Sequence, residues 1–346
     1  MLHLRVISPA DRTDRVLETI ERATGVANVV LMPKAARRPA GDVLLFDVAR
    51  EAANDLIEEL KRLGLEEDGS IAIDNIELSI SRAAEEAEEQ APGEGDDAVI
   101  WDQLAQRVTA DSRITWAFLA FLAIATQIAG IGVLIPSQIL IVGAMVLGPE
   151  FGAVAAVCFG LLRRDPRLIA VASRTLVVGF AVAIAVTFAC AFVSRAIGWV
   201  TLDMLQHNDE VRFIVTPDKW SFIVALLAGA AGVLSITAGK SSALVGVFIS
   251  VTTVPAAGYM AVAMALGRWD AVGHSLAQLA VNIAGMVAAG TATLLVQRFL
   301  WHRYGRRIPI VADVHHEHEH EHEHEHDRRL GTRTRTGTGT GTGTGT

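Results

Sequence analysis

The chain has 346 residues, of which 51% are hydrophobic and 20% are charged, and its formal net charge is −8 at pH 7. The acidic residues gather in residues 85–97 and in a His/Glu-rich stretch near the C-terminus, so the charge indicates neither a nucleic-acid partner nor an enzyme for acidic substrates. The two cysteines, Cys158 and Cys190, lie in apolar stretches and form no disulfide framework. Charged residues almost vanish between residues 114 and 297, which predicts an integral membrane protein with a soluble N-terminal part.

Residues 1–80 are predicted to form a small α+β domain. Leu2, Leu4 and Val6 alternate with polar neighbours, as in a half-buried strand, and Val16 and Ile20 share one face of a following helix. Strands at 26–32 and 43–48, a helix around 56–63 and a last strand over 71–80 complete the order βαββαβ of a ferredoxin-like domain. Residues 1–15 show no signal peptide, so we expect this domain to be cytosolic.

Residues 81–112 are predicted to be an acidic linker followed by an amphipathic juxtamembrane helix. The linker stretch contains Pro and Gly among many Glu residues. In the helix, Ile100, Trp101, Leu104 and Val108 line one face. That face suits either the inner membrane surface or packing on protein, and the pattern does not choose between them.

Six apolar segments, each near or above the ~20 residues that a helix needs to cross a bilayer, make up a predicted transmembrane domain over residues 113–300. They lie at 114–134, 137–162, 168–195, 220–238, 242–266 and 272–298. The basic loop 163–167, Lys240 and the basic residues between 298 and 307 all fall on the side of the N-terminal domain. Because Lys and Arg in short loops prefer the cytoplasm, we expect a multi-pass protein of the cytoplasmic membrane with both termini inside.

The apolar region shows a weak internal duplication. Trp116-Ala117-Phe118 recurs as Trp220-Ser221-Phe222, and the stretch from Gly143 to Pro149 is matched by the stretch from Gly246 to Pro255. A repeat of three spans reverses its second copy across the membrane, so the predicted architecture is two inverted three-helix repeats, as in many secondary transporters. The interruptions would then be 143–152 and 252–258, with a pair of kinked helices that holds no site as the alternative.

Polar and helix-breaking residues inside these spans are the candidate site. Glu150 is the strongest, because an ionisable group in an apolar span is costly and suggests a proton or cation site. The alternative is a helix break that places Glu150 at the headgroups, or a buried protonated side chain. Gln278 and Asn282 share one helical face, where amides also serve to join helices. The intramembrane candidates are Glu150, Pro149, Gly143, Gly246, Thr252, Thr253, Pro255, Gln278 and Asn282.

The C-terminal residues 301–346 are predicted to be disordered, first rich in His and Glu and then in Thr and Gly. Clustered neutral imidazoles bind zinc, nickel or copper, so weak metal binding is expected of this low-complexity tail. Its histidines are His315, His316, His318, His320, His322, His324 and His326. No cofactor is expected elsewhere, and no enzyme activity, because the spans contain neither a nucleophile–base pair nor a metal triad.

Three stretches carry a resemblance to a known family: ILIVGAMVLGPEFGAVAAVCFGLLRRD, SALVGVFISVTTVPAAG and LAQLAVNIAG. They resemble the bacterial and archaeal membrane proteins grouped as domain of unknown function 389, over roughly residues 110–300. Ala153 stands where the family pattern has a second Pro, and only Pro255 remains of a second pair. The resemblance implies a multi-span protein of a bacterial or archaeal cytoplasmic membrane, often with a small N-terminal domain, and implies no established activity.

Two functions follow as expectations. The first is a transporter or channel for a small solute or ion, with the N-terminal domain as a cytosolic regulator. The second is a membrane sensor or scaffold that transports nothing and uses its N-terminal domain to bind a ligand or to assemble. The expected partners are the lipid bilayer and further copies of the chain, with no nucleic acid.

Overall fold

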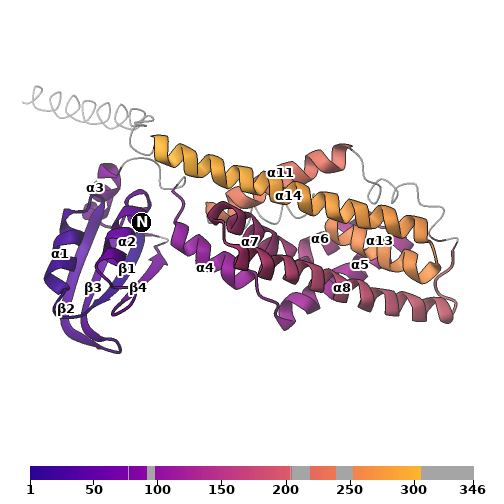
Figure 1. Ribbon diagram of the computed structural model, residues 1–346, viewed down its shortest axis with the longest axis horizontal. Coiled ribbons are helices and arrows are strands. Elements are labelled where there is room, and N and C mark those ends of the chain that lie inside the picture. Colours follow the sequence, from indigo (N-terminus) through magenta and orange to yellow (C-terminus); the bar gives the residue numbers. More distant parts are fainter. Residues whose placement is uncertain (77, 92–97, 203, 205–218, 239–251, 305–346) are drawn as a thin grey trace, which may run out of the picture.

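The computed structural model describes residues 1–76, 78–91, 98–202, 204, 219–238 and 252–304. At one end lies a sheet covered by short helices, and at the other a bundle of long apolar helices (Figure 1). The long final helix of the described chain runs back along the bundle, so that its last residues approach the sheet domain (Figure 1).

The N-terminal domain has the predicted order of strands and helices. Its elements are β1 (Leu2–Ser8), α1 (Thr13–Arg22), β2 (Val26–Arg37), β3 (Ala40–Val48), α2 (Arg50–Arg62) and β4 (Ser70–Asn75). The sheet is antiparallel with the order β2-β3-β1-β4. Leu2, Leu4 and Val6 of β1 are buried beneath the two helices, as the alternating pattern predicts. The last strand is shorter than predicted. It ends at Asn75, and Ile80 beyond it is exposed.

Two more helices connect this domain to the bundle. Helix α3 (Arg82–Gln90) packs on β2 and β3, and the N-terminal ammonium group lies 3.0 Å from Glu88. Helix α4 (Trp101–Asp111) buries Leu104 and Val108 against the bundle, so this amphipathic face packs on protein.

The bundle contains seven described helices. They are α5 (Trp116–Leu134), α6 (Gln138–Leu147), α7 (Glu150–Arg163), α8 (Pro166–Ala196), α11 (Lys219–Thr237), α13 (Thr253–Leu266) and α14 (Trp269–Tyr304). Within the described residues, α5, α8, α11 and α14 are long and apolar enough to cross a membrane, and the pair α6–α7, bent by 51°, makes a fifth candidate. The predicted span 242–266 is described only from residue 252, where α13 has 14 residues. The described chain therefore has four to five apolar candidate spans after a small antiparallel sheet domain.

Corresponding helices in the two halves of the bundle match in length and spacing. Helices α5 and α11 both have 19 residues, and α7 and α13 both have 14. The second member of each pair begins 103 residues after the first, which is also the separation of Glu150 and Thr253, the first residues of α7 and α13. Helices α7 and α13 are each followed by a residue in the left-handed conformation, Arg164 with φ 56° and Gly267 with φ 77°.

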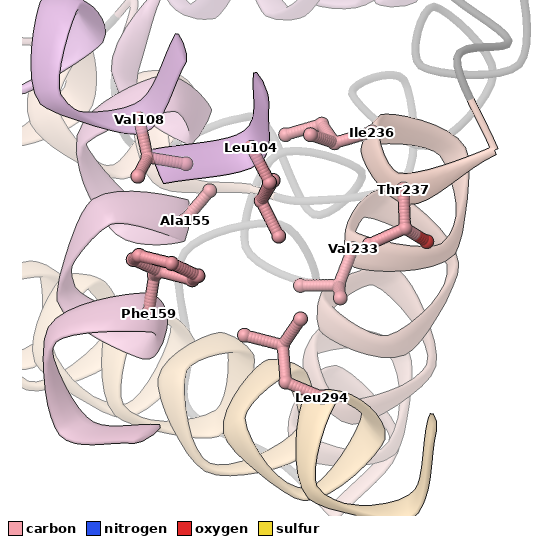
Figure 2. A pocket seen from close by; sticks show the side chains of 8 residues that line it. All are labelled: Leu104, Val108, Ala155, Phe159, Val233, Ile236, Thr237 and Leu294. Carbon is pink, nitrogen blue, oxygen red and sulfur yellow. The ribbon is translucent and has the colours of Figure 1, made fainter. Parts of the chain in front are cut away.

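The helix pair α5–α8 and the helix pair α11–α14 run in opposite directions. Near the starts of α5 and α8, Thr175 donates to the carbonyl of Ser112, so these two helices are parallel neighbours. Near the ends of α11 and α14, Gln297 donates to Thr237 at 2.9 Å, so this pair is parallel as well. The ends of α11 and α14 face α4, which leads directly into the start of α5, as the side chains in Figure 2 show. The pair α11–α14 is therefore antiparallel to the pair α5–α8.

Candidate functional site

The two interrupted stretches of the bundle meet at the first residues of α7 and α13. Helix α6 stops at Leu147, and α7 begins at Glu150 because Pro149 lacks the N–H that a continuous helix would require. The Thr253 hydroxyl, at the start of α13, donates to Glu150 Oε1 at 2.6 Å. Two helix N-termini from opposite halves are thus joined by one hydrogen bond, and we call this place the junction.

Two amides of α14 complete the junction. Asn282 Nδ2 donates to Thr252 Oγ1 at 2.9 Å, and Gln278 Nε2 approaches the same oxygen at 3.3 Å. Gln278 and Asn282 are one helical turn apart, with 3.4 Å between Nε2 and Oδ1. The side chains are deeply buried, with Gln278 0%, Asn282 1% and Glu150 6% exposed. Glu150, Thr252, Thr253, Gln278 and Asn282, all candidates from the sequence, form one buried polar cluster.

Two oxygens of this cluster lack a hydrogen-bond donor among the described residues: Glu150 Oε2 and Gln278 Oε1. A Cβ added at Gly148 would collide with Glu150 Oε2, so this oxygen lies at the break between α6 and α7. Neither α7 nor α13 has a side-chain cap, because the N-cap residue of α7 is Pro149, whose side chain has no acceptor, and the N-cap residue of α13 is Thr252, whose hydroxyl oxygen accepts from the amides of α14. The uncapped N–H groups and the helix dipoles place partial positive charge around the junction.

The other sequence candidates lie around or outside the junction. Pro149 occupies the N-cap position of α7, and Pro255 is buried in the first turn of α13. Gly143 lies on an open face of α6, where an added Cβ would meet nothing within 4 Å, so it takes no part in the cluster. Gly246 and the seven histidines of the tail lie outside the described residues.

Two residues near the junction escaped the sequence analysis. Ser275 is fully buried, and it lies three residues before Gln278 on the same face of α14, a spacing that could have drawn attention to it. Asp111 ends α4 and packs against Gly152 in the first turn of α7. Loss of water around the Asp111 carboxyl raises its pKa, with Arg107 opposing the effect. No sequence pattern indicates which helix α4 would contact.

A small pocket lies beneath α4, and its lining is almost entirely apolar, unlike that of the junction. Side chains from α4, α7, α11 and α14 converge on it (Figure 2). Its lining residues are Leu104, Val108, Ala155, Phe159, Val233, Ile236, Thr237 and Leu294, so Thr237 is the only polar one. Such a lining has no group that would hold an ion, and the pocket is the packing interface between α4 and the bundle.

A sheet domain followed by several helices long and apolar enough to cross a bilayer defines the chain as a multi-pass membrane protein. The model of the family described as domain of unknown function (DUF389) matches residues 145–288, from the end of α6 to within α14. The resemblance found in the sequence is thereby confirmed, and the matched region includes every residue of the junction.

An archaeal protein is also similar to this chain. An uncharacterised protein of the archaeon Methanocaldococcus jannaschii is 23% identical over 209 residues, which cover 60% of this chain and 62% of the relative. The chain therefore spans less than two thirds of that relative's length. No solved structure matches the chain.

Proposed function

We propose that this protein is a transporter or channel that moves a small solute or ion through the junction. The observation that carries the proposal is the hydrogen bond between Glu150 and Thr253, which joins two uncapped helix starts inside an apolar bundle. Polar groups at membrane depth are expensive and are usually retained for function. The unpaired oxygens of Glu150 and Gln278 support the proposal further, because a purely structural cluster would satisfy its own acceptors.

The architecture that we propose is six spans in two inverted three-helix repeats. It is supported by the constant separation of 103 residues between corresponding helix starts and by the opposite directions of α5–α8 and α11–α14. In inverted-repeat transporters the site lies where interrupted helices of the two repeats meet near the middle of the bilayer. The junction has this position in the proposed architecture.

The proposed orientation places both termini in the cytoplasm of a bacterium or archaeon, with the N-terminal domain as a regulator. Arg163 at the end of α7, Arg164 after it and Arg167 in the first turn of α8 support it, because basic residues at such turns favour the cytoplasmic side. The contact of α4 with α7 gives the domain a physical route to the junction. We propose no enzymatic activity.

The test is a flux screen of the purified protein in liposomes, with a panel of inorganic ions and small solutes under defined gradients. Glu150→Gln should reduce any wild-type flux by about tenfold or more, since a hydrogen bond to a charged group contributes about 1.5–3 kcal/mol. Asn282→Ala should reduce it by about two- to tenfold, since a bond to the neutral Thr252 hydroxyl contributes about 0.5–1.5 kcal/mol. Gln297→Ala is the matched control, because it removes another amide bond of α14 far from the junction. Flux that is absent from the wild type, or unchanged in both junction variants, would contradict the proposal.

A sensor or scaffold is the second candidate, and the attachment of α4 favours it. Asn54 of α2 binds the backbone at Val99 and Trp101 on the approach to α4, so a ligand on the N-terminal domain could shift α4 and α7 together. Hydrogen exchange of the full chain, with and without a library of small ligands, tests this function. Protection confined to the sheet and α4, in a protein that moves no solute, would favour the sensor.

A further inference from the structure

The polar side chains of the junction leave part of the Glu150 carboxylate without a partner among the described residues. The Thr253 hydroxyl hydrogen is used by Glu150 Oε1, and Thr252 Oγ1 already accepts from the amides of Asn282 and Gln278. Glu150 Oε2 and Gln278 Oε1 remain buried with no donor among the described residues. Because a carboxylate only accepts, Glu150 can become a hydrogen-bond donor only by binding a proton.

Glu150 also lacks a counter-ion within the described part of the chain. The α13 residues beside it, Thr253 and Val254, and the two amides of α14 are uncharged. The titratable group that packs on this turn is Asp111 of α4, against Gly152, with Arg107 on the same helix. A buried charge without an ionic partner is costly to hold.

We propose that Glu150 is a reversible proton-binding site and that proton movement through the junction drives the transport. This inference rests on the proposed function. A proton taken from water adds to a carboxylate oxygen and forms an O–H bond, which removes the charge and turns an acceptor into a donor. Its loss to water on the other side restores the carboxylate, so one proton is carried for each cycle.

The geometry favours a proton over a metal cation. Ca²⁺ takes about 6–8 oxygen ligands and Mg²⁺ requires a nearly complete octahedron. The described junction offers two unpaired side-chain oxygens, and the described residues contain no cluster of three His, Cys, Asp or Glu side chains able to hold a metal. A proton needs only one oxygen and one acceptor nearby.

Infrared difference spectroscopy of the full chain in lipid, between acidic and alkaline buffers, tests the proposal directly. We expect a carbonyl band of a protonated carboxyl group that is present in acid, lost in alkali and missing from Glu150→Gln. Thr253→Val should keep the band and shift its frequency, because the Glu150 carboxyl group then loses the hydrogen bond from the Thr253 hydroxyl. Asp111→Asn, which removes the neighbouring carboxyl group, should retain it and serves as the control.

Three results would overturn the proton site. The first is a carboxyl band that Glu150→Gln leaves intact. The second is a band assigned to Glu150 that stays unchanged over the whole pH range, which would make its proton a fixed structural one. The third is a band that disappears at constant pH when Na⁺ is added, which would assign the site to a metal cation.

A second readout separates this inference from the proposed function. Liposomes loaded with the pH indicator pyranine report proton entry together with any solute found in the flux screen. A titrating Glu150 band in a protein without any flux would leave the proton site standing and refute transport. Solute flux that moves no protons and ignores a pH gradient, with no titrating band, would refute the proton site and leave transport standing.

Discussion

Two glycines of the bundle show how much a single residue depends on its surroundings. A Cβ added at Gly258 of α13 would lie 2.8 Å from both the backbone nitrogen of Gly130 and the backbone oxygen of Thr126, in α5. A Cβ added at Gly143 of α6 would meet nothing within 4 Å. Backbone cannot move aside as a flexible side chain can, so Gly258 allows α13 and α5 to touch, whereas Gly143 has no such role.

We expect Gly258→Ala to lower the thermal unfolding temperature in detergent, because overpacking costs about 1–3 kcal/mol. Gly143→Ala should leave it unchanged or raise it, since Ala within a helix is favoured over Gly by roughly 0.5–1 kcal/mol. Scanning calorimetry of both variants measures the difference. Equal unfolding temperatures for the two variants would mean that the α5–α13 contact is not close in the folded protein.

The residues of the junction could be predicted from the sequence, but their pairing could not. Glu150, Gln278 and Asn282 stand out because polar groups in apolar spans are costly. The bond from Thr253 to Glu150 spans 103 residues, and it depends on how two helices are placed beside each other by packing. Gly143 was included because it belongs to the apolar motif, and only the structure separates it from the cluster.

At the scale of elements, α4 is held at its start by one side chain. Asn54 Nδ2 donates to the Val99 carbonyl at 2.8 Å, and Asn54 Oδ1 accepts from the Trp101 N–H at 3.3 Å. Ile100 between them belongs to the core of the N-terminal domain. The domain and α4 are therefore one mechanical unit, and α4 in turn packs on α7.

We expect Asn54→Ala to increase hydrogen exchange over residues 98–104, because each lost bond to backbone costs about 0.5–1.5 kcal/mol. Lys61→Met is the matched control on the same helix. This variant removes the 2.6 Å ion pair between Lys61 and Asp102. Both side chains of the pair are 33% exposed, and ion pairs at such exposure contribute at most about 1 kcal/mol to stability. Exchange that rises as much in the control would show that Asn54 does not anchor α4.

Most boundaries of the long helices could be predicted, because charges and caps mark them. Asp165 caps α8 through the N–H groups of Arg167 and Leu168, with Pro166 in the first turn, and the sequence shows this signal directly. The break in the second span was predicted only as the range 143–152. The structure places it at Gly148 and Pro149, since a bend needs the one position without an N–H and a neighbour without a side chain.

At the scale of the whole molecule, the proposed inverted repeat makes a prediction about sidedness. Arg167 and Asp270 are each the second residue of a long helix, α8 and α14, and both are exposed. After Cys158 and Cys190 are replaced by Ser, Arg167→Cys and Asp270→Cys should react with an impermeant maleimide from opposite sides of sealed vesicles. Opened vesicles provide the control, in which both must react. Labelling of both from one side would contradict the inverted repeat.

Hydropathy indicates the apolar segments but not their assembly. The spans over 114–134, 168–195 and 220–238 correspond closely to α5, α8 and α11, because length and apolarity alone define them. The region 242–266 has the same apolar composition, yet its described part is a helix of 14 residues packed between α5, α8 and α14. Burial on all sides and exposure to lipid favour the same residues, so the sequence does not distinguish them.

The contact of Glu150 with Thr253 has a consequence for the origin of the junction. Under the proposed repeat these two residues are counterparts, and counterparts can touch only on the twofold axis that relates the halves. A dimer of identical three-span chains would face itself there with two acids, which repel, or with two alcohols, which carry no charge. Joining the copies into one polypeptide lets each side change alone, so an acid can face an alcohol there.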